Sequence, residues 1–475
     1  MTQPIALQRI RRLLVANRGE IAVRIIRAAR EMGAQTVLVH SSADRNSLAC
    51  QMADRTVEIG PPPAAKSYLD IPAILATARN QEVDAVHPGY GFLAENADFA
   101  RQVEAAGLIF VGPTADTIAL MGDKARARAM AQAVGVATVP GSAGALADVV
   151  QAMGMAKEIG YPLMIKAVAG GGGRGIRVVE HAEALHAAFA AAQREALAAF
   201  GDGHLYLERF MPQARHLEVQ ILGDGQRVIH CYERECSLQR RRQKIMEEAP
   251  SPALDDAQRN RLCQAAVRLA QSVAYRGAGT VEFLFDQDEF HFIEMNTRIQ
   301  VEHPVTEMVT GLDLVREMLL IADGQPLRWQ QQDIRLRGAA IECRINAEDP
   351  QRNFLPTPGS IEQLQLPGGP GVRVDSMLYP GCVIPPYYDS MLAKLTVWDE
   401  DRKHALSRMR RALDELHISG VAHTKSLHQA LLADADVCAA RYHTRFLEHW
   451  LAHWPVSHTA DTVADPLARD TGRTA

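Results

Sequence analysis

Two glutamates near the middle of the chain have the spacing of a metal site. Glu282 and Glu294 lie in two predicted strands that are joined by the turn residues 286–289. Folded as a hairpin with a short loop, this segment places the two glutamates directly opposite each other, with Cβ atoms about 5 Å apart. Like charges there destabilise the strand pair unless a cation lies between them, and Asn296 shares the face of Glu294. Two carboxylates and an amide oxygen suit Mg²⁺, which also binds substrate phosphates, although two solvated acids are the simpler alternative.

A run of glycines is a candidate phosphate-binding loop. Residues 170–175 read Gly-Gly-Gly-Gly-Arg-Gly and lie between two short apolar segments, 162–168 and 176–179. Glycines are kept where the backbone must approach a ligand closely, and the N–H groups of such a loop cradle phosphate oxygens. Since the P-loop pattern is missing and the loop returns to a strand, we predict a lid over phosphate, with a flexible linker as the alternative.

Basic residues accompany these features. Lys166 lies within the apolar segment before the glycines, where burial without an anion is costly. Phosphate is one partner for it, and an edge strand that brings the lysine to the surface is the alternative. Residues 240–244 read Arg-Arg-Arg-Gln-Lys, which either bind a small anion such as phosphate or bicarbonate or form a solvated patch balanced by Glu247 and Glu248. By itself Lys124 would be an ordinary solvated residue.

Polar residues at alternate positions follow the predicted hairpin. Arg298, Gln300 and Glu302 recur at every second residue, and Asn296 shares their parity. We therefore predict one extended strand that lines a pocket, where a cation, an amide and a carboxylate could bind an oxyanion and supply a base. A polar sheet edge is the alternative. Arg344 faces the polar side of another alternating segment, where an ordinary cross-strand ion pair would explain it.

Composition indicates an ordinary globular protein of several domains. The 475 residues suggest three units, and 47% hydrophobic and 23% charged residues are typical of a soluble fold. With a net charge of −5, no basic field would recruit nucleic acid or an acidic membrane. Apolar runs stay far below the roughly 18 residues that span a bilayer, and residues 1–12 contain no signal peptide. The 7 scattered cysteines include no CxxC pair, which favours a reduced, cytoplasmic compartment.

The elements that must position these residues follow an α/β pattern. Strands at 12–17 and 36–40 flank an amphipathic helix, and this alternation predicts a parallel, Rossmann-like first domain. The dinucleotide fingerprint GxGxxG is absent after the first strand, which disfavours NAD binding. We also predict helices at 258–275 and 402–416, a strand-rich segment from residue 337, and a mobile tail over the last twenty residues.

Together these motifs resemble the biotin carboxylase family of the ATP-grasp superfamily. The resemblance runs from about residue 10 to residue 450. The matching segments are Val15–Ala22, His87–Asn96, Met121–Lys124, the glycine loop, Arg215–Gln220, Glu294–Glu302, Glu342–Pro350 and Pro386–Met391. The family implies an α/β fold with a Rossmann-like N-terminal (pre-ATP-grasp) domain at 1–122 and an ATP-grasp domain at 123–335. A mobile glycine-rich lid would occupy about 138–210, a strand-rich α+β C-terminal domain 336–450, and a flexible tail 451–475.

The resemblance also implies roles for individual residues. The implied ATP contacts are Lys124, Lys166, Gly172, Gly173, Glu208, Arg209, Phe210, Met211, His216, Arg242, Glu282 and Glu294. The implied metal ligands for Mg²⁺ or Mn²⁺ are Glu282, Glu294 and Asn296, and the implied bicarbonate site is Lys244, Arg298, Gln300 and Val301. Glu302 would remove the bicarbonate proton, while Arg344 and Tyr90 would face biotin. Arg298, Glu302, Lys244 and Arg344 form the implied catalytic set.

The implied activity is carboxylation of biotin by bicarbonate and ATP through carboxyphosphate. No Met-Lys-Met biotinylation segment is present, so we expect biotin on a separate biotin carboxyl carrier protein. Carboxyltransferase subunits of an acetyl-CoA or related acyl-CoA carboxylase, which would serve fatty acid synthesis, are further expected partners. Homodimerisation is expected because Arg27 and Glu31 match the family's dimer surface, although the segment near Leu364 differs.

One position departs from the family pattern. Arg242 stands where the family usually has a histidine that contacts the nucleotide. This keeps open an ATP-grasp carboxylase that acts on another acceptor, such as a urea-like substrate. A weakened scaffold that only binds nucleotide and carrier protein is a third hypothesis, which the intact acidic and basic residues disfavour.

Overall fold

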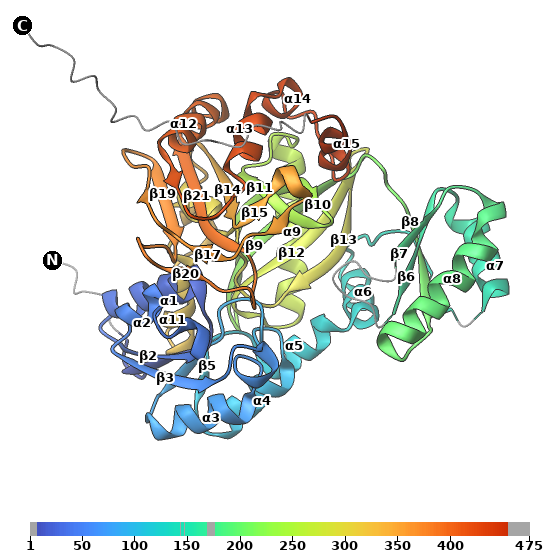
Figure 1. Cartoon of the computed structure of the whole chain (residues 1–475). Helices are drawn as coiled ribbons and strands as arrows, with labels where there is room; N and C mark the ends of the chain where they lie inside the picture. The colour runs from blue at the N-terminus through green and yellow to red at the C-terminus, as the bar shows by residue number, and fades with distance from the viewer. Residues whose placement is uncertain (1–6, 143, 147, 169–175, 455–475) are drawn as a thin grey trace, which may run out of the picture.

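The computed structural model describes residues 7–142, 144–146, 148–168 and 176–454. Its main sheets are a parallel sheet at the N-terminus, a long antiparallel sheet through the centre and a small sheet in a projecting arm (Figure 1). The predicted α/β fold with three domains is confirmed. Gly172 and Gly173 of the predicted lid and most of the predicted tail lie outside the described residues.

The N-terminal sheet is parallel, with the order β3-β2-β1-β4-β5. Its strands are β1 (Arg12–Val15), β2 (Gln35–Ser41), β3 (Arg55–Gly60), β4 (Ala85–His87) and β5 (Ile109–Phe110). The helices around it are α1 (Gly19–Glu31), α2 (Leu48–Met52), α3 (Ile71–Asn80), α4 (Ala97–Ala105) and α5 (Ala115–Gly122). Side chains of β1 alternate between the two cores, since Leu13 and Val15 pack with α1 while Leu14 packs with α3 and α4.

The loop after β4 is fixed by the turn into α1. The Asn17 side-chain amide donates to the carbonyl oxygens of Pro88 and Tyr90, both at 2.7 Å. Gly89 between them has a φ of +63°, and a Cβ there would lie 2.9 Å from Asn17 Nδ2. Only glycine therefore fits, and the loop holds Tyr90 in one place.

The central sheet is antiparallel and continues from the ATP-grasp region into the C-terminal region. Its order is β13-β12-β9-β10-β11-β14-β21-β19. The strands are β9 (Arg215–Asp224), β10 (Val228–Arg240), β11 (Gln243–Ala249), β12 (Arg276–Asp286), β13 (Glu289–Asn296), β14 (Ala339–Asn346), β19 (Val372–Ser376) and β21 (Met391–Asp399). Helix α9 (Asp256–Ser272) covers one face and begins earlier than predicted because Asp255 and Gln258 form a capping box.

The β12–β13 hairpin has the predicted register. Glu282 pairs with Glu294, and Thr280 with Asn296. Gln287 and Asp288 form the two-residue turn, with φ values of 48° and 65°. Such a turn matches the twist of the flanking strands and sets the register as far as the pair Phe283 and Phe292. A β-bulge between Glu282 and Phe283 then shifts the register by one residue, which brings Glu282 opposite Glu294.

The predicted extension of this strand to Glu302 is wrong. β13 ends at Asn296, and residues 297–302 leave the sheet before α10 (His303–Thr310) begins. The Thr297 N–H donates to Glu95 Oε1 at 3.1 Å instead of to a strand neighbour. Pro304 then occupies the first turn of α10, where its fixed φ suits a helix start.

The projecting arm follows α6 (Lys124–Ala133) and returns at β9 (Figure 1). Its strands are β6 (Leu163–Ala167), β7 (Ile176–Val179) and β8 (Leu205–Arg209), in the order β7-β6-β8, and its helices are α7 (Val149–Ile159) and α8 (Ala182–Phe200). Lys166 is on β6, between the other two strands, so the edge-strand alternative for this lysine is wrong.

The remaining elements surround the central sheet. The helices are α10, α11 (Leu314–Ala322), α12 (Arg402–Glu415), α13 (Lys425–Ala433), α14 (Ala435–Cys438) and α15 (Phe446–His453). Short strands are β15 (Glu348–Asp349), β16 (Leu355–Pro356), β17 (Gly359–Ser360), β18 (Leu364–Gln365), β20 (Val383–Ile384) and β22 (His417–Ile418). Within the described part of the chain, no helix is long and apolar enough to cross a membrane.

Candidate active site

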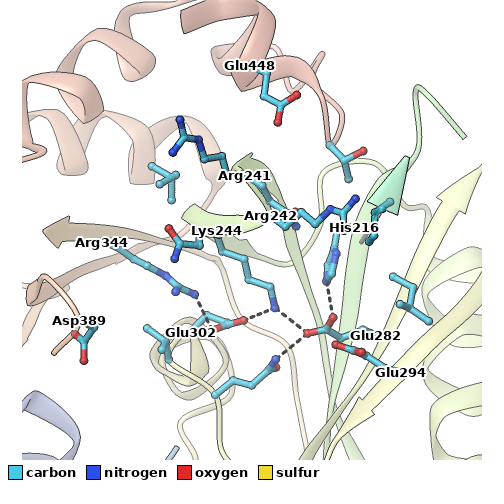
Figure 2. A pocket seen from close by; sticks show the side chains of 18 of the residues that line it. His216, Arg241, Arg242, Lys244, Glu282, Glu294, Glu302, Arg344, Asp389 and Glu448 are labelled. Atoms are coloured by element: carbon cyan, nitrogen blue, oxygen red, sulfur yellow. Dashed lines mark hydrogen bonds and ion pairs between the residues drawn. The ribbon is translucent and has the colours of Figure 1, made fainter. Parts of the chain in front are cut away.

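A cavity of about 1500 Å³ lies where the central sheet, the arm and the C-terminal region meet. Except for the two glycines outside the described residues, the residues singled out above all line it: Tyr90, Lys124, Lys166, Glu208, Arg209, Phe210, Met211, His216, Arg242, Lys244, Glu282, Glu294, Asn296, Arg298, Gln300, Val301, Glu302 and Arg344. Figure 2 shows many of these side chains pointing toward one another from different strands.

Lys244 lies at the centre of a buried cluster of carboxylates. Its ammonium group donates to Glu282 Oε1 at 2.9 Å and to Glu302 Oε1 at 2.5 Å (Figure 2). It also donates to Glu218. Burial alone would lower the pKa of Lys244, but these carboxylates raise it well above the ordinary value. The ammonium therefore stays charged and holds the acids of β9, β12 and the segment before α10 together.

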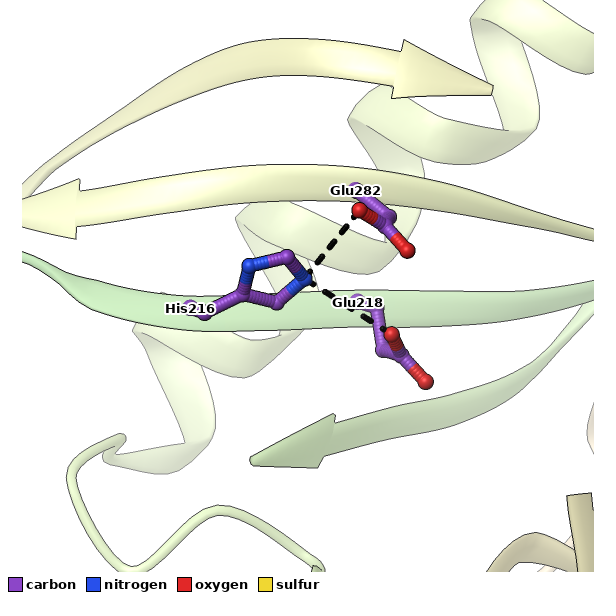
Figure 3. Close-up of side chains that lie close together, drawn as sticks. All are labelled: His216, Glu218 and Glu282. Atoms are coloured by element: carbon purple, nitrogen blue, oxygen red, sulfur yellow. Dashed lines mark ion pairs between the residues drawn. The ribbon is translucent and has the colours of Figure 1, made fainter. Parts of the chain in front are cut away.

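The carboxylate of Glu282 is suited to a cation. His216 Nε2 lies 3.2 Å from Glu282 and 3.8 Å from Glu218, and these side chains form a buried group compact enough to hold a metal ion (Figure 3). Burial alone would raise the pKa of Glu282, but Lys244 and His216 hold it well below its ordinary value. Burial opposes a charge on His216, yet Glu282 outweighs it and raises the pKa of His216 to about 9.

Glu294 completes the acidic pair on the hairpin. Burial and the nearby charge of Glu282 raise its pKa, while Lys124 acts in the opposite direction. Asn296 donates through Nδ2 to Glu282 Oε1 at 2.9 Å, and its Oδ1 accepts from Arg298 at 3.0 Å. The buried carboxylate of Glu282, the half-buried carboxylate of Glu294 and the amide oxygen of Asn296 are hard oxygen donors on adjacent strands, which fits a magnesium-type cation.

The segment after β13 is held by groups from its own domain and from the two others. Arg298 Nε donates to Glu95 Oε2 of the N-terminal region at 2.8 Å. Gln300 donates to Glu282 at 2.8 Å and accepts from the fully buried Arg234 at 3.0 Å. The Val301 carbonyl accepts from the Lys394 ammonium at 3.0 Å. These bonds bring the side chains into the cavity although the predicted strand is absent.

Arg344 closes the opposite end of the cluster. Its Nη2 donates to Glu302 Oε2 at 2.9 Å, and its Nε donates to Glu247 at 2.6 Å. Burial and Glu218 act to raise the pKa of Glu302, but Lys244, Arg344 and Arg234 together lower it, so this carboxylate is ionised. Burial raises the pKa of Glu247 to about 7.

Tyr90 lies on the same side of the cavity as Arg344. Its hydroxyl donates to Glu20, which also accepts from Lys394 Nζ at 3.1 Å. Burial, followed by the charge of Glu20, raises the pKa of Tyr90 well above its ordinary value. The phenol therefore remains a neutral hydrogen-bond donor.

Basic residues line the half of the cavity next to the arm. Lys166 pairs with Glu208, which also accepts from Arg128 Nη1 at 2.7 Å. Across the cavity, Arg241 and Arg242 form the turn between β10 and β11, with φ values of 49° and 66°. Positive φ is unusual for arginine, and a strained backbone that presents two guanidinium groups to a cavity is characteristic of a binding site.

Several lining or supporting residues were not singled out from the sequence. Glu218 shares the alternating pattern of His216 and Gln220 on β9, so strand parity was a usable signal. Glu95 belongs to the matching segment His87–Asn96, but only the structure shows that it holds Arg298. No comparable signal marks Thr444, which lines the cavity from the C-terminal end of the chain.

Known protein families match most of the chain. Residues 9–118 match the biotin carboxylase N-terminal domain, residues 123–330 the carbamoyl-phosphate synthase L chain ATP-binding domain, and residues 342–449 the biotin carboxylase C-terminal domain. The biotin carboxylase of Pseudomonas aeruginosa is 52% identical over 441 residues, which cover 92% of this chain and 98% of that protein.

Solved structures agree. The biotin carboxylase–beta-gamma-ATP complex of Campylobacter jejuni is 47% identical, with a TM-score of 0.89 over 93% of this chain and 99% of the other. The biotin carboxylase domain dimer of Hydrogenobacter thermophilus 2-oxoglutarate carboxylase, solved with MgADP, ADP and bicarbonate, is 48% identical, with a TM-score of 0.88 over 93% and 98%.

The fold and the cavity define an ATP-dependent ligase of the ATP-grasp type. The fold combines a parallel N-terminal sheet with an antiparallel sheet and a projecting arm, and the cavity combines basic and acidic side chains. The length and the sequence identity of the matches specify the family within this class of ligases. The chain belongs to the biotin carboxylase family. The cofactors of this family are ATP with Mg²⁺ and biotin carried by a protein.

Proposed function

We propose that this enzyme carboxylates biotin on a separate carrier protein, using bicarbonate and ATP by way of carboxyphosphate. The supporting observation is a continuous chain of buried ion pairs inside one cavity, which runs through Glu282, Lys244, Glu302 and Arg344 (Figure 2). It connects carboxylates suited to a divalent cation with a guanidinium at the opposite end. A short-lived intermediate requires such closeness, because it must be made and used in one enclosed site.

The acidic hairpin and the basic side chains would hold the nucleotide. Mg²⁺ or Mn²⁺ bound by Glu282, Glu294 and Asn296 would supply positive charge to the phosphate oxygens. Lys166 and Arg242 face the same cavity and would add charge from the protein. Attack by a bicarbonate oxygen on the γ-phosphorus would release ADP, and the loop of Gly172 and Gly173 would exclude water.

Bicarbonate would lie among Lys244, Arg298, Gln300 and Val301. Lys244 and Arg298 supply fixed charge to its oxygens. Glu302 is ionised and touches both Lys244 and Arg344, so it is placed to accept the bicarbonate proton.

Biotin would bind between Arg344 and Tyr90. Carboxyphosphate breakdown yields carbon dioxide and phosphate, and the phosphate can take the N1 proton of biotin. Arg344 would stabilise the negative charge that develops on the ureido oxygen, as an oxyanion-hole donor does. The nitrogen then attacks carbon dioxide to give carboxybiotin.

We further propose a cytoplasmic, homodimeric subunit of an acetyl-CoA or related acyl-CoA carboxylase, with carrier and carboxyltransferase subunits as partners. The match to 98% of the length of the Pseudomonas aeruginosa biotin carboxylase supports a biotin carboxylase subunit. One similar structure is the biotin carboxylase domain of a 2-oxoglutarate carboxylase. The final acceptor of the carboxyl group is therefore the property to test. Purified carboxylated carrier offered to carboxyltransferases of each type identifies it.

Transfer of labelled bicarbonate tests the reaction. With MgATP and [¹⁴C]bicarbonate, we expect acid-labile label on biotin and none on urea. Label on urea, or ATP turnover indifferent to biotin, would support another acceptor and make Arg242→His the first variant to examine. Nucleotide binding without turnover would support the scaffold.

A further inference from the structure

The wall of the nucleotide half of the cavity includes a segment from the C-terminal end of the chain. Thr444, Arg445 and Glu448 line the cavity beside Phe210 and Met211. Figure 2 shows Glu448 facing the turn that carries Arg241 and Arg242. The segment that leads to these residues, 437–445, joins α14 to α15, and it lies far along the chain from β8 and β9.

Direct contacts bind this segment to the start of β9. The Thr444 N–H donates to the Ala214 carbonyl at 3.0 Å, and the Arg445 guanidinium lies 5.5 Å from the centre of the Phe210 ring. Ala440 has a φ of 56°, a conformation that a non-glycine residue adopts only where its surroundings hold it.

Two arginines hold the backbone carbonyls of the same segment. Arg215, next to His216 on β9, donates through both Nη atoms to the Ala440 carbonyl, at 3.0 and 3.1 Å. Arg402, the first residue of α12, donates to the carbonyls of Cys438 at 2.6 Å and Val437 at 3.0 Å. Arg402 thus binds the end of α14, and Arg215 binds the backbone just after it.

A tyrosine and a glutamate join these arginines. Arg402 Nε donates to Glu248 Oε2 at 2.6 Å, and the buried Tyr442 hydroxyl donates to the other oxygen of Glu248. Arg215 lies over the Tyr442 ring at 4.6 Å. Glu248 is on β11 and Arg215 is on β9, the strands that also carry Lys244 and His216. The segment is therefore tied to the strands that position the reaction chemistry.

We propose that Arg215, Glu248, Arg402 and Tyr442 are positioning residues for nucleotide binding, which clamp segment 437–445 onto β9 and β11. The clamp places Thr444 and Arg445 against Phe210 and so sets the affinity for the nucleotide. This inference rests on the proposed location of ATP in the cavity, and the residues act through the segment instead of touching substrate.

Variants of the clamp have a matched control. Arg402→Lys and Tyr442→Phe remove bonds to the segment or to Glu248. Arg259 is an equivalent arginine elsewhere, since it binds Glu233 at 2.9 Å and the Leu254 carbonyl at 3.1 Å without contacting segment 437–445. Arg259→Lys therefore reports the cost of losing a buried guanidinium alone.

The measurement is MgADP affinity by calorimetry, together with the melting temperature and the Michaelis constants. We expect Arg402→Lys and Tyr442→Phe to weaken ADP binding and raise KM for ATP about tenfold, with kcat at saturating ATP and KM for bicarbonate unchanged. Arg259→Lys should lower the melting temperature but leave ADP affinity unchanged. If Arg402→Lys fails to fold, the milder Tyr442→Phe decides.

Clamp variants that lose thermal stability but bind ADP like wild type would overturn the inference. ADP binding does not depend on biotin. Wild-type protein that binds ADP without biotin-dependent turnover would therefore contradict the proposed function, while the variants would still decide the role of the clamp.

Discussion

The charge on Lys244, which lines the cavity, connects three buried carboxylates. Its ammonium forms ion pairs with the carboxylates of Glu218, Glu282 and Glu302 at once. Removing one partner of a buried ion pair leaves charge that water cannot solvate. A residue assigned to bicarbonate binding thus also supports the fold.

Lys244→Gln is expected to impair both stability and activity. Loss of the ammonium should reduce the free energy of unfolding by about 3–5 kcal/mol, and biotin-dependent turnover by at least about 100-fold. Urea denaturation and steady-state kinetics measure the two effects. A variant as stable as wild type would show that the carboxylates are neutralised by another group. Lys425→Gln is the control, because the Lys425 ammonium donates to the Leu416 carbonyl at 2.7 Å and lies outside the cavity lining.

The raised pKa of Glu247 predicts that the free energy of unfolding depends on pH. Burial raises its pKa from 4.5 to about 7 in the folded state, so between these values the folded protein binds more protons than the unfolded chain. Its contribution is therefore complete below pH 4.5 and is lost as the pH rises through 7. Relative to Glu247→Gln, wild type should lose about 3 kcal/mol across this window.

Urea denaturation at pH 5, 6 and 7.5 measures this difference. Glu82→Gln, at an exposed glutamate, controls for the loss of a carboxylate. A wild-type-minus-variant difference that does not change with pH would contradict the assignment.

At the scale of elements, hairpin turns determine where the reactive side chains lie. The pairing of Glu282 with Glu294 was predicted, but the two-residue turn alone would place Glu282 opposite Ile293. A β-bulge directly after Glu282 shifts the register by one residue. The strand predicted through Glu302 was wrong for a physical reason. Alternation indicates only that side chains point in the same direction. In the structure, the Thr297 N–H bonds to Glu95 instead of to a neighbouring strand, and the sequence does not reveal this tertiary contact.

The positive φ values of Arg241 and Arg242 lower the stability of the fold, while the turn presents both guanidinium groups to the cavity. Arg242→Gly relieves a left-handed φ and should stabilise the fold by roughly 0.5–1 kcal/mol, while the lost guanidinium should raise KM for ATP about tenfold. Gln287→Gly is the matched control, since Gln287 has a φ of 48° in a turn outside the cavity. It should gain similar stability with KM unchanged. Equal KM values in both variants would argue against a binding role for Arg242.

At the scale of the whole molecule, one antiparallel sheet joins the ATP-grasp region to the C-terminal region through the pairing of β11 with β14. Their separation along the chain is large, and no sequence pattern indicates which distant strands pair. The individual side chains of the cavity were recognisable from motifs, whereas the clamp of Arg215 and Arg402 required the assembled sheet. Alternation of strands and helices predicted the parallel first domain, and the resemblance to biotin carboxylases implied the types of the other two domains. The pairing of strands far apart in the sequence became known only from the structure.

Ligand binding across these regions should stabilise the whole fold. At 100 times the dissociation constant, MgADP should add about 2.7 kcal/mol to the free energy of unfolding. Excess EDTA should remove much of this gain, because the phosphates would then face Glu282 and Glu294 without a metal. Differential scanning fluorimetry measures both effects. A gain unchanged by EDTA would contradict the metal assignment of these two glutamates.

Glu302 is the most direct test of the central claim, that this cavity carboxylates biotin with bicarbonate. The measurement is ADP release from wild type and from Glu302→Gln, with Mg²⁺ and bicarbonate, in the presence and absence of free biotin. Wild-type ADP release should rise strongly with biotin, and the variant should lose turnover by about 10²–10⁴-fold while still binding ADP. Biotin-stimulated release that persists at the wild-type rate in Glu302→Gln would contradict the account.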